Sequence, residues 1–201
     1  NECSWNLSQQ ELLQQVHKAE EVFDQHMCDV NPKLDFPKDR IFLLEVYAGR
    51  HSPLTDAVKQ LGLPSVRFSR EDGDLSTIAG RAKLWSLIER TQPEHIWVAP
   101  ECGPWSGWNH LSQQKSMSMF DTIQNKQREQ LPHLQLCVKL CQYQIKRQRH
   151  FYLEQPQGSS LIKQDVMIPI LKHVMLASFD MCSFGLRIPG AQKYLKKGRS
   201  E

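Results

Sequence analysis

Hydrophobic and polar positions follow two patterns along the chain, one typical of buried strands and one typical of amphipathic helices. Short apolar or β-rich segments predict strands at 41–49, 64–70, 94–100, 150–156 and 178–186. Apolar residues at helical spacing predict the helices between them, at 53–63, 77–92, 120–149 and 160–177, with a bend or a new helix start at Pro132. This alternation predicts an α/β fold with a doubly wound, mostly parallel sheet and helices on both faces.

A further helix is predicted before the first strand. Residues 8–27 place their apolar side chains on one face, and Ser8 with Glu11 forms a capping box at the start. Turn formers and two prolines follow, so we expect an N-terminal helix and linker at 1–40 that pack on a core domain at 41–201. The opening Asn1 in place of methionine suggests a processed product or part of something longer.

Composition narrows the class of protein only slightly. The net charge of +3 is too small to indicate a nucleic-acid partner by itself, although basic residues gather at 146–149 and 193–199, where a solvated face is the usual interpretation. The six cysteines lack paired spacing, which favours reduced thiols in an intracellular setting over a zinc site or a disulfide framework. No apolar run reaches the roughly 20 residues of a membrane span.

The unusual residues fall where the predicted strands end, which is the edge at which doubly wound sheets bind ligands. Cys102 follows the third strand in "PECGPWS", where Pro100, Gly103 and Pro104 fix an irregular loop. A cysteine in such a loop is a candidate nucleophile, because nearby backbone amides can favour the thiolate. The alternative is a core thiol, which is the commoner role of a buried cysteine.

This loop resembles the catalytic loop of the cytosine-5 DNA methyltransferases, Pro-Pro-Cys-x-x-Phe-Ser. Three more segments resemble motifs of that family in the same order: "LEVYAG" its first motif, "FYLEQP" its Glu-Asn-Val strand, and "FGL" its Tyr-Gly-Val strand. A less specific similarity is to methyltransferase-like segments of mobile-element polyproteins. The resemblance covers residues 41–188 and implies a Rossmann-like class I methyltransferase fold that is incomplete at its C-terminal end and lacks a target-recognition domain.

The resemblance also implies roles for individual residues. Cys102 would add to carbon 6 of cytosine, Glu154 would stabilise the ring, and Ser106 would complete the catalytic set. S-adenosylmethionine would be the cofactor, held by Glu45, Tyr47, Ala48, Gly49, Asp74 and Pro100. Glu71 and Asp72 are alternatives to Asp74 as the acidic residue after the second strand.

The implied partner is nucleic acid, with DNA favoured over RNA and a nuclear location if DNA is the substrate. The residues assigned to it are Trp105, Trp108, Arg187, Lys196, Lys197 and Arg199. The two tryptophans would stack on nucleotides, and packing against the following helix is the alternative. Further protein segments or subunits would complete the sheet.

Several departures from the family pattern support a second hypothesis, a catalytically inactive methyltransferase fold that serves as a binding or structural subunit. The loop after the first strand holds a single glycine, Gly49, where the family has several, and Glu101 replaces a proline beside the thiol. A third hypothesis, a thiol-dependent hydrolase, requires a histidine near Cys102, for which His110 and His150 are the candidates.

Overall fold

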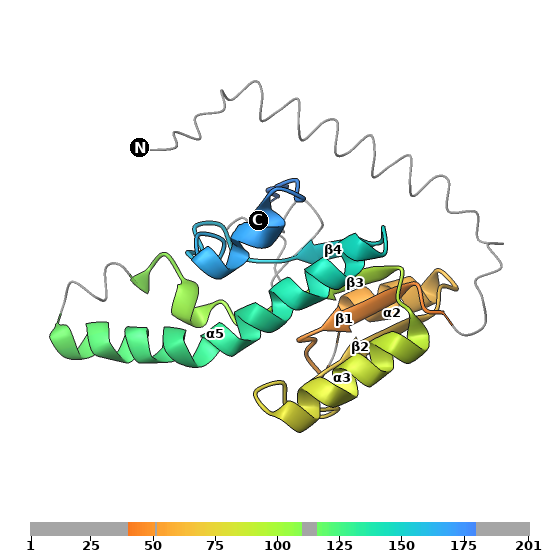
Figure 1. Ribbon diagram of the computed structural model, residues 1–201, viewed down its shortest axis with the longest axis horizontal. Coiled ribbons are helices and arrows are strands. Elements are labelled where there is room, and N and C mark those ends of the chain that lie inside the picture. Colours follow the sequence, from red (N-terminus) through yellow and green to blue (C-terminus); the bar gives the residue numbers. More distant parts are fainter. Residues whose placement is uncertain (1–39, 51, 110–115, 180–201) are drawn as a thin grey trace, which may run out of the picture.

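A computed structural model describes residues 40–50, 52–109 and 116–179 of the chain. Within them lies a sheet of four parallel strands, ordered β2-β1-β3-β4 (Figure 1). The strands are β1 (Leu43–Val46), β2 (Ser65–Phe68), β3 (His95–Val98) and β4 (His150–Leu153). Each lies inside a segment that the sequence predicts as a strand, so the expectation of an α/β fold with a parallel sheet is confirmed.

Helices α3 (Ile78–Thr91) and α5 (Met117–Lys146) cover one face of the sheet. Leu44 of β1 and Ile96 of β3 are fully buried there and belong to the same hydrophobic cluster as Leu84 of α3 and Leu140 of α5. The strands are apolar on this face because two helices exclude water from it.

Helix α2 (Pro53–Gln60) covers the opposite face over β1 and β2. Glu45 lies between two residues whose side chains point toward α3 and α5, so its own side chain points the other way, toward α2. There its carboxylate accepts hydrogen bonds from the hydroxyls of Ser52 and Thr55. Helices therefore lie on both faces, with α3 and α5 in front of the sheet and α2 behind it in Figure 1.

Helix α5 has the length that the sequence predicts, but it begins and ends three residues before the predicted segment 120–149. It begins at Met117, where the Ser116 hydroxyl accepts a hydrogen bond from the Met119 amide, and it runs for 30 residues with Pro132 inside it. Of the two alternatives predicted at Pro132, the structure shows the bend and not the new start, because the helix is continuous and changes direction near its middle (Figure 1). Pro132 has no amide hydrogen, so the carbonyl oxygen of Arg128 lacks its helical hydrogen-bond donor. Both residues are exposed, so water can bond to that oxygen instead.

The helix predicted at 160–177 is also wrong. That segment contains only a 3-10 turn, η2 (Asp165–Met167), and the four-residue helix α6 (Ile168–Leu171). Pro169 is tolerated only in the first turn of a helix, which is where it lies in α6. The apolar residues that suggested a long helix instead fill a second core cluster against α5, formed by Leu161, Met167 and Ile170 with Leu134, Val138, Cys141 and Trp105.

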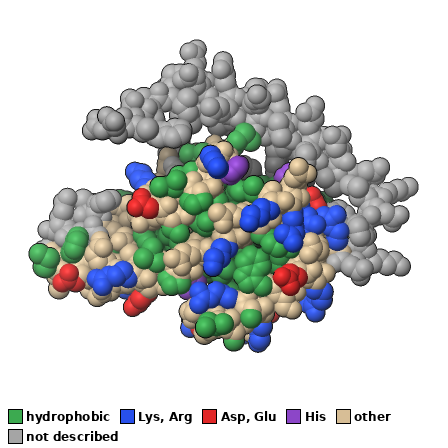
Figure 2. Space-filling model, in the orientation of Figure 1, with side chains coloured by type: hydrophobic (Ala, Val, Ile, Leu, Met, Phe, Trp, Pro, Cys, Tyr) green, Lys and Arg blue, Asp and Glu red, His purple; other side chains and the backbone are tan. Residues whose placement is uncertain are grey.

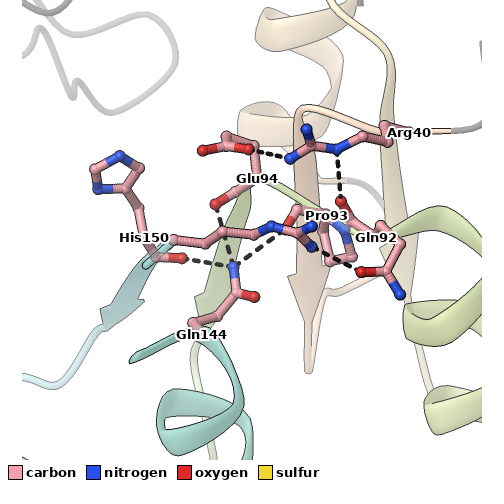
Figure 3. A network of polar contacts seen from close by, with 7 residues as sticks. Arg40, Gln92, Pro93, Glu94, Gln144 and His150 are labelled. Atoms are coloured by element: carbon pink, nitrogen blue, oxygen red, sulfur yellow. Dashed lines mark hydrogen bonds and ion pairs between the residues drawn. The ribbon is translucent and has the colours of Figure 1, made fainter. Parts of the chain in front are cut away.

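A polar network fixes the end of α5 to the edge at which β3 and β4 begin (Figure 3). The amide nitrogen of Gln144, a fully buried residue, donates to the carbonyl oxygens of Pro93, Glu94 and His150 at 3.2, 3.1 and 2.9 Å. Arg40 pairs with the Glu94 carboxylate beside it. These bonds tie α5 to three backbone carbonyls where β3 and β4 begin, one of which, that of Glu94, also accepts from the His150 amide, so the network is structural.

Some expected elements lie outside the described residues. These are the N-terminal helix and linker, apart from residue 40, and most of the strand predicted at 178–186. None of the helices in the described part of the chain combines the length and the apolar composition needed to cross a membrane, as the sequence predicts.

Candidate active site

A cavity of about 440 Å³ opens at the carboxyl ends of β1, β2 and β3. The segments that follow these three strands contribute Tyr47 and Ala48, Asp74, and Glu101, and α5 contributes Gln130 and His133. The chain runs from β1 to β2 on one side and places β3 on the other, so the strand order reverses between β1 and β3. Ligands of doubly wound sheets bind at such a reversal, and the volume falls in the range of small-molecule sites.

Tyr47 forms the wall of the cavity at the end of β1. Its backbone has φ 64°, a left-handed conformation that is uncommon for a bulky residue and often occurs at functional sites. Its hydroxyl oxygen lies 3.1 Å from Nδ1 of His133, and the two rings meet edge to face. Burial raises the pKa of Tyr47 far above its usual value, so the hydroxyl stays protonated.

His133, which belongs to α5, lines the cavity next to Tyr47. Its pKa is lowered, first by burial and then by the positive charge of Arg81, while Asp74 and Glu101 raise it by less. The imidazole is therefore more often neutral than a solvent-exposed histidine, and it pairs with a neutral phenol rather than with an ion.

Among the acidic residues after β2, Asp74 is the one that lines the cavity. Asp72 is engaged in its own turn, accepting hydrogen bonds from the amide and hydroxyl of Ser69, and Glu71 pairs with Arg50 at the surface. Hydrogen bonds from Ser76 lower the pKa of Asp74, so its carboxylate is ionised. The structure thus distinguishes Asp74 from Glu71 and Asp72, which the sequence leaves as alternatives for the acidic residue after the second strand.

Three other residues assigned to the cofactor do not line the cavity. Glu45 is buried under α2 and bonded to two hydroxyls, and Gly49 is exposed. Pro100 is buried with its carbonyl oxygen bonded to Gln155, and the next residue, Glu101, faces the cavity in its place. The sequence missed Glu101, Gln130 and His133, because the side chains of a loop and of the middle of a helix follow no period that indicates a ligand site.

Cys102 differs from the two other cysteines of the described residues. Cys137 and Cys141 are buried in α5, and burial raises both of their thiol pKa values, that of Cys141 to about 12. Cys102 is half-buried at the start of the turn η1 (Gly103–Trp105), in the loop after β3. It is the described thiol best placed to react.

The tryptophans of this loop have different environments. Trp105 is 1% exposed and packs against α5, so its ring is not available for stacking on a nucleotide. For Trp105, the alternative expectation, packing against the following helix, is correct. Trp108 is 77% exposed. Ser106 ends η1, where its hydroxyl accepts a hydrogen bond from the Trp108 amide.

Glu154 follows β4 and is held by β3. Its carboxylate accepts a hydrogen bond from the indole nitrogen of Trp97 at 3.2 Å, and that indole stacks on Tyr152. The bond uses one carboxylate oxygen, Oε2. The acid is half-buried at the carboxyl edge of the sheet, on the strand next to the one that leads to Cys102.

The loops after β3 and β4 are joined by direct bonds. The side-chain amide of Gln155 donates to the Pro100 carbonyl oxygen at 3.0 Å, and the Ser160 amide donates to the Trp105 carbonyl oxygen at 2.7 Å. Gly107 passes so close to Gly158 that an added Cβ would lie 2.9 Å from the Gly158 oxygen. The loop that carries the thiol and the loop that carries the acid are thus packed against each other.

The hydrolase hypothesis finds no support in the placement of His150, which begins β4 and lies at the opposite edge of the sheet from Cys102. His110 lies outside the described residues, as do Arg187, Lys196, Lys197 and Arg199.

Figure 2 shows Lys and Arg side chains spread over the face that carries α3 and α5, with fewer acidic side chains among them.

Comparison of the chain with protein-family models, with curated proteins and with solved structures found no match.

Proposed function

We propose that the chain is an S-adenosylmethionine-dependent methyltransferase domain that acts on cytosine in nucleic acid, with DNA as the favoured substrate. One observation carries the proposal most directly. The cavity at the reversal of strand order is lined by Tyr47, Ala48 and Asp74, three residues that the sequence resemblance assigns to this cofactor. Its volume of about 440 Å³ suits an adenosyl ligand.

The residues present fit the parts of that ligand. The Asp74 carboxylate can accept hydrogen bonds from ribose hydroxyls, and the Tyr47 ring offers an aromatic surface to a flat heterocycle. When bound, S-adenosylmethionine supplies an electrophilic methyl group on a sulfonium centre.

Cys102 provides the chemistry that cytosine lacks, since carbon 5 of the ring is a poor nucleophile. The thiol loses its proton and its sulfur bonds to carbon 6, which makes carbon 5 an enamine carbon able to take the methyl group. A base then removes the proton from carbon 5, and the bond between carbon 6 and sulfur breaks. These steps return the thiolate and leave 5-methylcytosine.

Glu154 would stabilise the ring during the addition. Its carboxyl group can bond to ring nitrogen 3 and the exocyclic amine, where charge develops. The bond from Trp97 would orient the carboxyl group, and the packing between the loops after β3 and β4 would hold the loop of Glu154 against the loop of Cys102. A cytosine within a duplex would have to leave the stack to reach this edge.

A second candidate is a domain that binds nucleic acid or protein without catalysis. Glu45 favours it, because the acid that the resemblance assigns to the cofactor is bonded to Ser52 and Thr55 inside the fold. Gly49 favours it as well, because it is exposed and does not line the cavity.

Transfer of a labelled methyl group tests the two candidates. The full chain is incubated with S-adenosylmethionine labelled in its methyl group and with cytosine-rich DNA, single-stranded and duplex. We expect incorporation with the native chain, loss of it in Cys102→Ser, and at least a hundredfold lower rate in Glu154→Gln. Cys141→Ala, which removes a buried thiol of α5, serves as the control and retains activity.

The outcome separates the candidates. Absence of both cofactor binding and methyl transfer to DNA or RNA would favour the non-catalytic domain. Equal transfer by the native chain and by Cys102→Ser would contradict the assignment of the nucleophile.

A further inference from the structure

We propose that Glu101 recognises the positively charged sulfonium of the cofactor, so that the site discriminates S-adenosylmethionine from its neutral thioether product. This inference rests on the proposed function and names the residue that sets its ligand selectivity. Neither the sequence motifs nor the resemblance assigns a role to this side chain.

Glu101 is placed for such a role by two elements. It follows β3 at the carboxyl edge and lines the cavity, and the Gln130 side chain of α5 donates to its Oε2 atom at 3.1 Å. This bond comes from a neutral amide, so it orients the carboxylate without neutralising it.

The charges around the cavity leave Glu101 without a cationic partner. Among the residues that the structure describes, none forms an ion pair with Glu101. The other carboxylate of the cavity, Asp74, has Arg70 at 3.9 Å and is therefore partly compensated. His133, which faces both acids, has a lowered pKa and adds little positive charge. Glu101 is exposed and Arg70 also lines the cavity, so a ligand cation near Glu101 would meet a carboxylate that is unpaired but partly screened.

The chemistry of transfer places the sulfonium at this end of the cavity. The methyl group must reach carbon 5 of a ring whose neighbouring carbon is bonded to the Cys102 sulfur. The sulfonium therefore has to lie at the side of the cavity closest to Cys102. Glu101 precedes Cys102 directly and lines that cavity, so its carboxylate is the nearest acid along the chain to the reacting sulfur.

A consequence follows for the product. Transfer converts the sulfonium into a thioether and removes its positive charge, so the attraction to Glu101 ends when the reaction is complete. A site built this way binds the substrate form of the cofactor more tightly than the spent form, and product release is favoured.

Titration calorimetry on the full chain tests the inference with two ligands, S-adenosylmethionine and S-adenosylhomocysteine. We expect the native chain to bind the sulfonium form about tenfold more tightly, and Glu101→Gln to lose most of that difference while its affinity for the thioether changes less than about twofold. Glu89→Gln is the matched control, because it removes the same charge from the exposed part of α3.

The results distinguish this inference from the proposed function. Equal weakening of both ligands in Glu101→Gln, or no weakening of either, would overturn the role of Glu101 while leaving cofactor binding in place. Absence of binding for both ligands in the native chain would overturn the proposed function itself, and the inference with it.

Discussion

The side-chain amide of Gln155 donates a hydrogen bond to the carbonyl oxygen of Pro100 at 3.0 Å, with both residues buried. Gln155 follows the proposed catalytic acid Glu154, and Pro100 lies two residues before Cys102. The oxygen of the Gln155 side-chain amide also accepts a hydrogen bond from the Ser159 hydroxyl at 3.0 Å, which fixes the orientation of that amide. This pair therefore joins the segment that carries the acid to the segment that carries the thiol.

Replacing Gln155 by alanine should affect transfer more than cofactor binding. The change leaves the Pro100 carbonyl buried without a partner, which costs about 1–3 kcal/mol of stability, and it loosens the two loops. The affinity for S-adenosylmethionine should change little, because Gln155 does not line the cavity. Gln157→Ala, an exposed neighbour on the same loop, is the control. Equal rates of methyl transfer in the two variants would contradict a positioning role for Gln155.

Alkylation should distinguish Cys102 from the cysteines of α5. Burial raises the thiol pKa of Cys137 and Cys141, the latter to about 12, and shields both sulfurs from reagent. In the native protein near pH 8, iodoacetamide should modify Cys102 at least tenfold faster than either of them. Peptide mapping by mass spectrometry measures the rates. Modification of Cys141 as rapidly as Cys102 in folded protein would argue against the described burial.

Stability should depend strongly on Gln144. Gln144→Leu removes a donor to three backbone carbonyls and should lower the free energy of unfolding by about 2–4 kcal/mol. Gln135→Leu, at an exposed position of the same helix, should change it by less than about 0.5 kcal/mol. Urea unfolding followed by circular dichroism compares the two variants. Similar urea midpoints for the two variants would mean that the hydrogen bonds of Gln144 contribute little to the free energy of unfolding.

Stability should also depend on pH through His133. Because its pKa in the folded state lies below the usual 6.5, the unfolded state takes up the proton first as the pH falls. The contribution of His133 is therefore complete above pH 6.5 and is lost as the pH decreases toward the lower, folded-state value. Burial is the largest cause of the lowered pKa, the charge of Arg81 adds to it, and the charges of Asp74 and Glu101 oppose it, while the uncharged Tyr47 hydroxyl lies against the ring.

The variant His133→Gln tests this dependence, since its amide can still bond to the Tyr47 hydroxyl. Between about pH 7 and pH 5 it should lose less stability than the native chain, because one proton-uptake site of the unfolded state is gone. Thermal unfolding across this range gives the difference, and parallel curves for the two proteins would contradict the lowered pKa.

The fold was largely predictable from the sequence, and its departures have local causes. Segments such as 41–49 and 94–100 predict strands because burial on both faces requires apolar residues. The segment 160–177 has equally apolar residues, but Pro169 limits helix formation and Trp105 offers them a nearby core to join. Periodicity records which residues are buried and does not record what they are buried against.

The candidate site was less predictable, because it depends on the direction of loop side chains. Sequence resemblance predicts that a cofactor site follows β1, and Tyr47 lines the cavity at the end of that strand. The resemblance does not indicate that the Glu45 carboxylate accepts hydrogen bonds from two hydroxyls at the start of α2. It also does not indicate that Glu101, and not Pro100, lines the cavity. Those outcomes depend on contacts between segments that are distant in the chain.

Covalent trapping tests the central claim most directly. The full chain is incubated with S-adenosylmethionine and a DNA oligonucleotide carrying 5-fluorocytosine, whose fluorine cannot be removed as a proton is, so that the bond between carbon 6 and sulfur persists. We predict a denaturant-resistant adduct whose mass includes the transferred methyl group and whose attachment maps to Cys102, with no adduct in Cys102→Ser. A chain that binds the cofactor and the oligonucleotide but forms no adduct, or forms one at another residue, would contradict the account.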